Sequence, residues 1–506
     1  MILAEGVSLL AFVYAGLSLP LLILIGATVF VLSMKNPSWG VYILLGELFF
    51  GSRGRLLDYG FVSLRMVVFT AVLLAWIVKQ FPISPPSEDL PKGDNFQFPI
   101  KSLIHNSKFI VLYLLLLVVI GFGIIWGIVN GNGLVNVWGD ANGYLYLLIF
   151  PVVLLTITAR EQIDKVLQIL AAAVVLVALK TLILFVWFAG DFNGVATLYH
   201  WIINQDIGEI TGIVGSASRI FMQSQFYSLA GLFVFGALLF PSLRGSFSDR
   251  SNPKKEYEIA SSVRLRRTEL AMTKAQLWLV FVSALFAVIM SLSRSFWLGG
   301  LFAAIFILAV LLYKKAEIKK IAKFAGIIIL IAAMELVGIF GLTKVLSGGV
   351  SETVLSRVQN PASEAAGNAR LLLLPKLLDG IAEAPILGSG FGRELSYKSF
   401  LPDRMSPQNP DGEITSFAFE WGYLDMALKF GFLGLLIYLF FIANIFARGW
   451  NKLRSTDHGL LTTGLLAGLV ALAVLNVTTP YLNHPLGIGY LILSALAFRD
   501  NEQAAG

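Results

Sequence analysis

The sequence contains no cysteine and few charged residues, and both absences narrow the classes of protein to which it can belong. Without a single cysteine among 506 residues, disulfide bonds and thiolate metal sites are excluded. Charged residues make up 14% of the chain, whereas a soluble domain carries about a quarter. Hydrophobic residues reach 57%, and the mean hydropathy is +0.78. This composition indicates a membrane protein.

Histidine is also scarce, and the acidic residues show no spacing typical of metal ligands. The chain has four histidines, scattered at His105, His200, His458 and His484. We therefore predict no metal site and no cofactor. The net charge of +7 indicates membrane orientation rather than nucleic-acid binding, because Lys and Arg concentrate in short segments between apolar runs.

Apolar runs recur along the chain, and most approach the roughly 20 residues that a helix needs to cross the hydrocarbon. We expect them at 7–34, 39–50, 61–78, 109–129, 143–157, 166–188, 221–240, 276–292, 296–313, 324–342, 419–447, 460–477 and 486–498. The first run, which Pro20 kinks or splits, lacks the basic start and cleavage site of a signal peptide. The pattern predicts an all-α, polytopic transmembrane helical bundle of about 12–14 spans.

Three short connections are rich in Lys and Arg, at 244–274, 314–323 and 448–454. Alternating the spans places all three on one side of the membrane, which the positive-inside rule makes cytoplasmic. The polar stretch that begins at residue 347 then lies outside. We therefore predict an N-terminal transmembrane region at 1–346, an extracytoplasmic loop with a surface helix at 347–418, and C-terminal transmembrane helices at 419–506.

Several arginines fall on the predicted outer face, against the usual bias, including Arg53 and Arg55 and, notably, Arg219, Arg294 and Arg370. The guanidinium fork suits bidentate pairing with phosphate, and ionisable groups at membrane depth tend to have a function. Interfacial snorkelling or a structural ion pair explains any single arginine equally well. For Arg219, Arg294 and Arg370 as a set, we favour an anion site.

Gly388, Gly390 and Gly392 form the motif GSGFG. Glycine at these positions allows a sharp turn or the close approach of a ligand. The motif follows no predicted strand, so a dinucleotide-binding fingerprint is not supported. Apolar residues at helical spacing predict a surface helix at 369–382 just before it, with Pro375 as a potential kink. A plain packing turn after that helix is an equally good interpretation.

Glu420 stands where the next apolar helix begins, and Tyr423 follows it at helical spacing. A partly desolvated carboxylate can have its pKa raised enough to act as a general base. The alternative is an acid that faces the positive end of the helix dipole. Asp425 and Lys429 lie four residues apart and can pair on one helix face.

The order of these motifs resembles that of the O-antigen ligase family, which includes lipid-linked polysaccharide polymerases. The resemblance runs from about residue 216 to residue 434 and is carried by ASRIFMQSQ, SRSFWLGG, Arg370, Pro385, GSGFG and EWGYLDMALKFGFLG. It implies a metal-independent, inverting glycosyltransferase of GT-C-like architecture in the bacterial cytoplasmic (inner) membrane. The donor would be an oligosaccharide on undecaprenyl pyrophosphate, presented at the outer face. Arg219, Arg294 and Arg370 would hold the pyrophosphate, and a general base would deprotonate a hydroxyl of a glycan or lipid acceptor.

Glu420 occupies the place where the ligases of the family carry a histidine. Glutamate can still serve as the base, and we favour a polymerase of surface polysaccharide over a ligase. A transporter or flippase of lipid-linked oligosaccharide explains the helices and basic residues equally well. The spans carry few charges, with Lys180 and Glu335 as exceptions, and the polar residues collect in one outer loop. That distribution favours surface chemistry. A purely structural membrane scaffold is a third alternative, but it gives no reason for the excess of arginines on the outer face.

Overall fold

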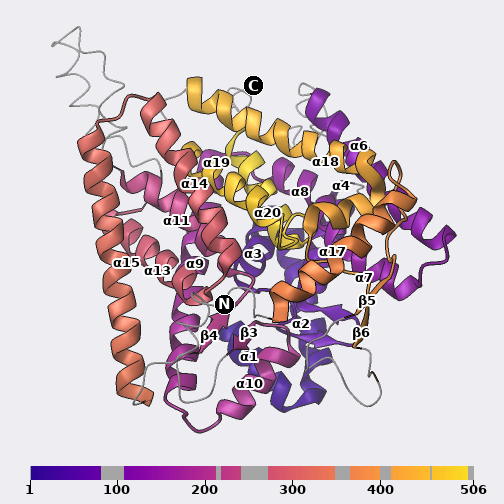
Figure 1. Cartoon of the computed structure of the whole chain (residues 1–506), viewed down its shortest axis with the longest axis horizontal. Coiled ribbons are helices and arrows are strands. Elements are labelled where there is room, and N and C mark those ends of the chain that lie inside the picture. Colours follow the sequence, from indigo (N-terminus) through magenta and orange to yellow (C-terminus); the bar gives the residue numbers. More distant parts are fainter. Residues whose placement is uncertain are drawn as a thin grey trace, which may run out of the picture.

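The computed structural model describes residues 2–80, 107–211, 218–240, 270, 272–347, 365–398, 409, 412–455 and 459–499. Helices dominate this part of the chain (Figure 1), which confirms the predicted helical membrane bundle. Within it, eight helical segments are long and apolar enough to cross a membrane, accompanied by five shorter apolar helices. The number of crossings and the three-part division of the chain stay predictions.

The helices of the N-terminal half are α1 (Ile2–Val13), α2 (Ser18–Lys35), α3 (Pro37–Phe50), α4 (Leu64–Gln80), α6 (Ser107–Val129), α7 (Leu134–Leu145), α8 (Ile149–Thr156), α9 (Arg160–Ala189), α10 (Val195–Asn204) and α11 (Gln225–Leu239). The first apolar run is indeed split, but at residues 14–17 rather than at Pro20. Pro20 lies in the first turn of α2, where a missing N–H breaks no helical hydrogen bond.

The C-terminal half contains α13 (Lys274–Ser291), α14 (Arg294–Tyr313), α15 (Ile318–Ser347), α17 (Ala365–Glu383), α18 (Gly422–Ser455), α19 (Gly459–Leu475) and α20 (Pro485–Ala497). Three antiparallel hairpins were not predicted: β1–β2 (Asp58–Tyr59, Val62–Ser63), β3–β4 (Glu209–Thr211, Arg219–Phe221) and β5–β6 (Leu395–Lys398, Glu413–Ser416). Their strands have four residues at most, too few for a clear alternating pattern.

The centre of the bundle consists of α11, α19 and α20, in which almost every residue is buried. These helices are apolar on all sides, as expected for helices surrounded by protein. Helix α19 packs against both α11 and α14. At Gly464, a side chain would overlap the backbone of Val234 in α11. Small residues allow this close approach of two membrane helices.

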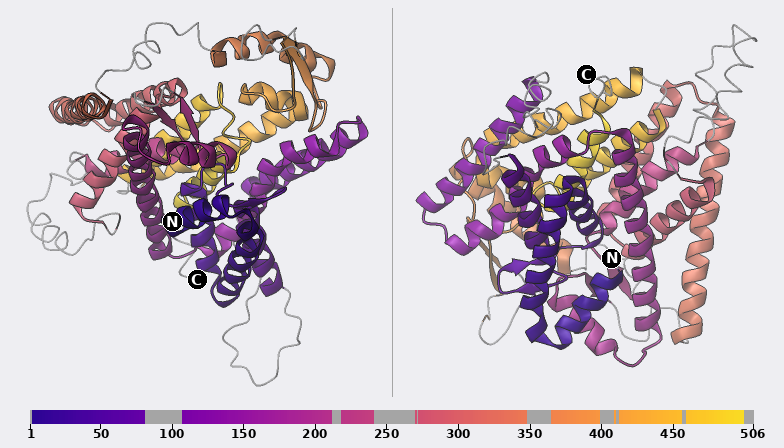
Figure 2. Two further views of the ribbon diagram at one scale, coloured as in Figure 1. Left: turned by 90° about the horizontal axis from the view of Figure 1, so that it is seen from below. Right: turned by 180° about the vertical axis from the view of Figure 1, so that it is seen from behind.

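The bundle has two chemically different ends. At the basic end, Lys314 Nζ donates to the carbonyl of Leu453 (2.9 Å), and Lys452 Nζ donates to that of Ala497 (2.9 Å). Two of the three basic connections therefore share one end, while most of the third lies outside the described residues. The opposite end, here named the arginine end, holds the hairpins β1–β2 and β3–β4 together with α10 (Figures 1 and 2). Helix α14 joins the two ends and spans about 30 Å, the thickness of the hydrocarbon.

Helix α18 differs from the single continuous span expected at 419–447. It begins at Gly422 and is broken at Phe430 and Gly431, where Gly431 has φ +67°. The backbone of the preceding loop fills the break. Ser389 N–H donates to the carbonyl of Leu428 (2.7 Å), and Phe432 N–H donates to that of Pro385 (2.8 Å). The loop thus satisfies groups that the broken helix leaves without helical partners.

All three glycines of the GSGFG motif have positive φ, between +74° and +80°. A side chain at Gly390 would overlap the backbone of Gly127 in α6, and one at Gly388 would overlap the backbone of Lys429 in α18. Asn132 Nδ2 adds a hydrogen bond to the carbonyl of Phe391 (2.8 Å). The close approach allowed by these glycines is therefore to α6 and α18.

We expect Gly390→Ala to destabilise the protein by at least about 1–3 kcal/mol, the usual cost of a strained backbone, because it adds a steric overlap to a positive φ. Thermal unfolding in detergent, followed by intrinsic fluorescence, measures the loss. Gly338→Ala is the matched control, since a side chain there meets open space in α15 and alanine favours a helix. Equal melting temperatures for Gly390→Ala and the unmodified protein would contradict the close packing of Gly390 against α6.

Candidate functional site

A cavity of about 350 Å³ lies at the arginine end, within the size range of small-molecule sites. Its walls come from α4, α7, the start of α18 and the connection between α19 and α20. The charged or polar lining residues include Arg53, Arg65, Asp140, Asn142, Gln223, Asp425, Lys429, Asn483 and His484, and the aromatic ones are Phe69, Trp138, Tyr146, Phe419 and Tyr481. Polar groups that converge between aromatic side chains suit a ligand with both hydroxyl groups and apolar faces, such as a sugar.

One wall of the cavity contains a buried ionic triad of Asp140, Lys429 and Asp425. Lys429 Nζ contacts Asp425 Oδ1 at 2.7 Å, which confirms the pair predicted from their spacing, and it also contacts Asp140 Oδ1. The second carboxylate oxygens accept hydrogen bonds from Asn483 Nδ2 (2.8 Å) and from Gly392 N–H (2.8 Å). The three side chains are at most 4% exposed.

The triad has two carboxylates for one ammonium group. In its ionised form it therefore carries a surplus negative charge, which is costly in a buried site. Its carboxylates lie beside the cavity, where they can accept hydrogen bonds from hydroxyl groups. Gly392 connects the glycine motif to this site through its bond to Asp140. Within the described part of the chain, no three His, Asp or Glu residues are grouped so that they could hold a metal ion.

Arg65 and His484 contribute a second buried group. Arg65 Nε donates to Glu47 Oε2 at 2.9 Å, and both side chains are at most 7% exposed. His484 lies just before α20 and accepts the Leu486 N–H at Nδ1 (3.3 Å). Burial, together with Arg65 and Arg53, lowers the pKa of His484 well below its usual range. The imidazole is therefore neutral at pH 7, with its proton on Nε2 as a hydrogen-bond donor.

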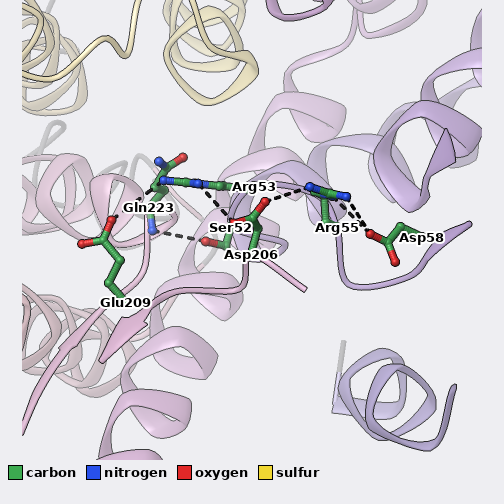
Figure 3. Close-up of polar contacts among 7 residues, drawn as sticks. All are labelled: Ser52, Arg53, Arg55, Asp58, Asp206, Glu209 and Gln223. Carbon is green, nitrogen blue, oxygen red and sulfur yellow. Dashed lines mark hydrogen bonds and ion pairs between the residues drawn. The ribbon is translucent and has the colours of Figure 1, made fainter. Parts of the chain in front are cut away.

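A network of arginines and carboxylates borders the cavity on the side of α10 (Figure 3). Arg53 contacts Asp206 at 3.2 Å and Glu209 at 3.8 Å. Arg55 contacts Asp206 and Asp58, each at 2.9 Å. The side chains are between 18% and 49% exposed. Arg53 alone among these residues also lines the cavity.

The predicted phosphate ligand Arg219 belongs to the same region. Its NH1 contacts Glu209 at 3.3 Å, and its guanidinium stacks 4.6 Å from the centre of the Phe221 ring. Its Nε donates to the carbonyl of Ser291 (2.8 Å), at the end of α13. Arg294, the second predicted ligand, opens α14 three residues later. The structure thus places Arg219 against the turn that leads to Arg294.

The third predicted arginine, Arg370, forms an ion pair with Glu420. This contact connects α17 to the segment before α18, and Trp421 Nε1 reinforces it by donating to the carbonyl of Arg370 (3.0 Å). The Glu420 side chain is 53% exposed. It is therefore not the partly desolvated carboxylate that the sequence led us to expect. It follows Phe419, which lines the cavity. Glu420 therefore lies next to the lining residues in the chain rather than among them.

Tyr423 ties the start of α18 to the end of α19, because its hydroxyl donates to the carbonyl of Ala473 (2.7 Å). Ser295, next to Arg294, contacts Thr478 (3.0 Å) just beyond the same helix. The segment 473–479 thus contacts both Tyr423, near Glu420, and Ser295, next to Arg294. That Arg219, Arg294, Arg370 and Glu420 act on one substrate stays a prediction.

Several lining residues were missed in the sequence, namely Arg65, Asp140, Asn483 and His484. Arg65 stands inside the apolar run 61–78, and Asp140 stands just before the run 143–157. A charge within or beside an apolar run is itself a sign of a functional or paired group. Applied to every run, that criterion identifies both residues but not their partners.

Residues 279–439 match the family model described as O-antigen ligase. The matched region extends from α13 into α18. It contains Arg294, Arg370, Glu420 and the Asp425–Lys429 pair. No curated protein matches the chain.

Proposed function

We propose that this protein is a membrane-embedded glycosyltransferase with a lipid-linked donor, because residues 279–439 match the O-antigen ligase family model. The donor is an oligosaccharide on undecaprenyl pyrophosphate, and the reaction takes place at the outer face of the bacterial cytoplasmic membrane. The arginine end is then the outer end, which agrees with the basic residues at the other end. The acceptor is a second glycan, so the enzyme builds surface polysaccharide, with a lipid acceptor as the less favoured choice.

The observation that carries this proposal is the Arg370–Glu420 pair, whose Glu420 directly follows the cavity-lining residue Phe419 in the chain, together with Arg53 in the lining of the same cavity. In the proposed step, the acceptor hydroxyl attacks the anomeric carbon from the side opposite the pyrophosphate. The bond from that carbon to the pyrophosphate oxygen breaks, and its electron pair leaves with the pyrophosphate. The hydroxyl proton passes to Glu420, and the configuration at the carbon inverts. No metal ion enters this step.

Arginines supply the electrostatic part of the proposed reaction. Preorganised cations that face developing negative charge are often the largest contribution to catalysis. Arg219, Arg294 and Arg370 come from three different parts of the chain, and a guanidinium can bind two phosphate oxygens at once. We assign these residues to the pyrophosphate group and Glu420 to the acceptor hydroxyl.

The broken helix α18 favours one rival function, a flippase of lipid-linked oligosaccharide. Transporters often have interrupted helices with ionisable groups at the interruption, and Lys429 stands directly before Phe430. In this protein, however, backbone groups of residues 385–390 fill the break, and Lys429 is held by two carboxylates. The break is thus sealed by a loop, which fits a rigid wall better than a moving gate.

Purified protein in liposomes with undecaprenyl-pyrophosphate oligosaccharide tests the proposal. We expect release of undecaprenyl pyrophosphate together with a ladder of longer glycans on gels. A single transfer to an added lipid acceptor would identify a ligase instead. Movement of an intact donor across the bilayer, without glycan transfer, would overturn the proposal in favour of a flippase.

A further inference from the structure

A second cavity at the arginine end, of about 560 Å³, lies between α1, α9 and α10. We propose that it binds the first isoprene units of the polyprenyl chain of the donor. The pyrophosphate then reaches Arg53, which shares its partner Glu209 with the pyrophosphate ligand Arg219, and the sugar enters the 350 Å³ cavity. This inference rests on the proposed function and adds the path of the lipid to it.

The mouth of this cavity is formed by apolar side chains that are exposed on the outside of the bundle. Val13 is 55% exposed, Leu179 44% and Ile183 49%. Leu179 and Ile183 belong to α9, which is long and apolar enough to cross a membrane. The opening therefore faces the lipid, and a hydrocarbon chain enters it without crossing water.

The only ion pair among the lining residues is neutral as a whole and largely covered. Lys180 Nζ contacts Glu5 Oε1 at 2.5 Å, and the two side chains are 11% and 15% exposed. The same ammonium lies over the rings of Phe50 and Trp201, 5.6 and 5.5 Å from their centres. An anionic headgroup gains little from such a neutralised pair. The cavity thus suits the chain of the lipid, and the phosphates need a separate site.

A site for the phosphates lies a few residues further along each of two chain segments that line the lipid cavity. Phe50 lines the lipid cavity, and Arg53 lines both a small cavity of about 160 Å³ and the 350 Å³ cavity. Three residues of chain cover about 10 Å at most. On the facing wall, Trp201 lines the lipid cavity and Asp206 lines the small one. The three cavities therefore form a series, in which the lipid-facing cavity is followed by the small cavity and then by the polar 350 Å³ cavity.

Arg53 is suited to a pyrophosphate that arrives at this point. Its carboxylate partners, Asp206 and Glu209, are 33% and 49% exposed. Exposed ion pairs of this kind contribute only about 0–1 kcal/mol, so a pyrophosphate group can replace them at small cost. Gln223 lines both the small cavity and the 350 Å³ cavity, which marks their junction.

A polyprenyl pyrophosphate with a benzophenone near its first isoprene units, and without any glycan, tests the path. The full-length protein in liposomes is irradiated with this probe, and the labelled peptides are mapped by mass spectrometry. We expect labelling on α9 and α10 that excess undecaprenyl pyrophosphate suppresses and excess phosphatidylglycerol does not. Equal suppression by both lipids, or labelling mainly on α15, would overturn the inference.

Ile183→Trp narrows the mouth and is expected to reduce the specific labelling at least fivefold. Leu330→Trp, on the lipid-exposed face of α15 where Leu330 is 60% exposed, is the matched control and should leave labelling unchanged. Unchanged labelling in Ile183→Trp would also contradict the site.

The labelling separates the lipid site from the proposed chemistry because it requires no turnover. Specific labelling on α9 and α10 without any glycan transfer supports the lipid site while the proposed function fails. Glycan transfer with a donor KM that Ile183→Trp leaves unchanged overturns the lipid site while the proposed function stands. If both are right, Ile183→Trp raises the donor KM several-fold and leaves kcat close to its original value.

Discussion

Replacement of Glu420 by alanine is expected to lower glycan transfer by about 10²–10⁴-fold, the usual contribution of a general base. The acceptor hydroxyl is a poor nucleophile while it keeps its proton, and Glu420 is the residue to which we assign proton removal. Glu420→Gln keeps the size of the side chain and the capacity for a hydrogen bond to Arg370, and it should be similarly inactive. The rate of undecaprenyl pyrophosphate release at saturating donor measures the effect.

Folding should be nearly unaffected by these substitutions. The Glu420 side chain is 53% exposed, and exposed ion pairs contribute about 0–1 kcal/mol to stability. Glu383→Ala is the matched control, because Glu383 forms a similarly exposed pair with Arg393 (2.7 Å, 61% exposed). We expect that variant to stay active. Near-normal transfer by Glu420→Ala would remove Glu420 as the base.

Lys429→Met is expected to destabilise the protein by about 3–5 kcal/mol, the usual cost of removing one partner from a buried ion pair. Methionine fills most of the space but leaves Asp140 and Asp425 without their shared cation. Their carboxylates, 4% and 1% exposed, then keep only the hydrogen bonds from Gly392 and Asn483. Chemical denaturation of the purified protein in detergent measures the difference.

The matched control for Lys429→Met is Lys320→Met. Lys320 pairs with Glu317 at 2.6 Å, but the two side chains are 47% and 61% exposed, so the loss should stay below about 1 kcal/mol. Adding Asp140→Asn and Asp425→Asn to Lys429→Met removes the unpaired charges and should recover much of the lost stability. If Lys429→Met is as stable as Lys320→Met, the triad does not support the fold.

Local patterns in the sequence predicted the features that depend on neighbouring residues. Apolar runs identified the membrane helices, because only a helix satisfies its own backbone groups in hydrocarbon. The spacing of Asp425 and Lys429 predicted their pair, because residues four apart share one face of a helix. The glycines at 388, 390 and 392 predicted a sharp turn or the close approach of a ligand, since glycine adopts positive φ without strain. The structure shows the positive φ of such a turn, with the close approach made to α6 and α18.

The features that depend on contacts between distant segments could not be predicted from the sequence. Asp140 contacts Lys429 across 289 positions of the chain, and no local spacing relates them. The break in α18 arises where the backbone of residues 385–390 enters the helix, so the helix alone gives no sign of it. The hairpins β1–β2 and β3–β4 carry Asp58, Glu209 and Arg219, yet their strands are too short to show a pattern.

The sequence by itself determined the class of protein and the course of most helices, because the membrane imposes strong and local rules on composition. The family match to residues 279–439 agrees with motifs readable in the chain alone. Tertiary structure decided which arginines meet which carboxylates, how Glu420 came to pair with Arg370, and where the cavities lie. Those outcomes depend on helix packing, which brings segments hundreds of residues apart into contact. Packing of this kind depends on the shapes and charges of both segments, and a local sequence pattern describes only one of them.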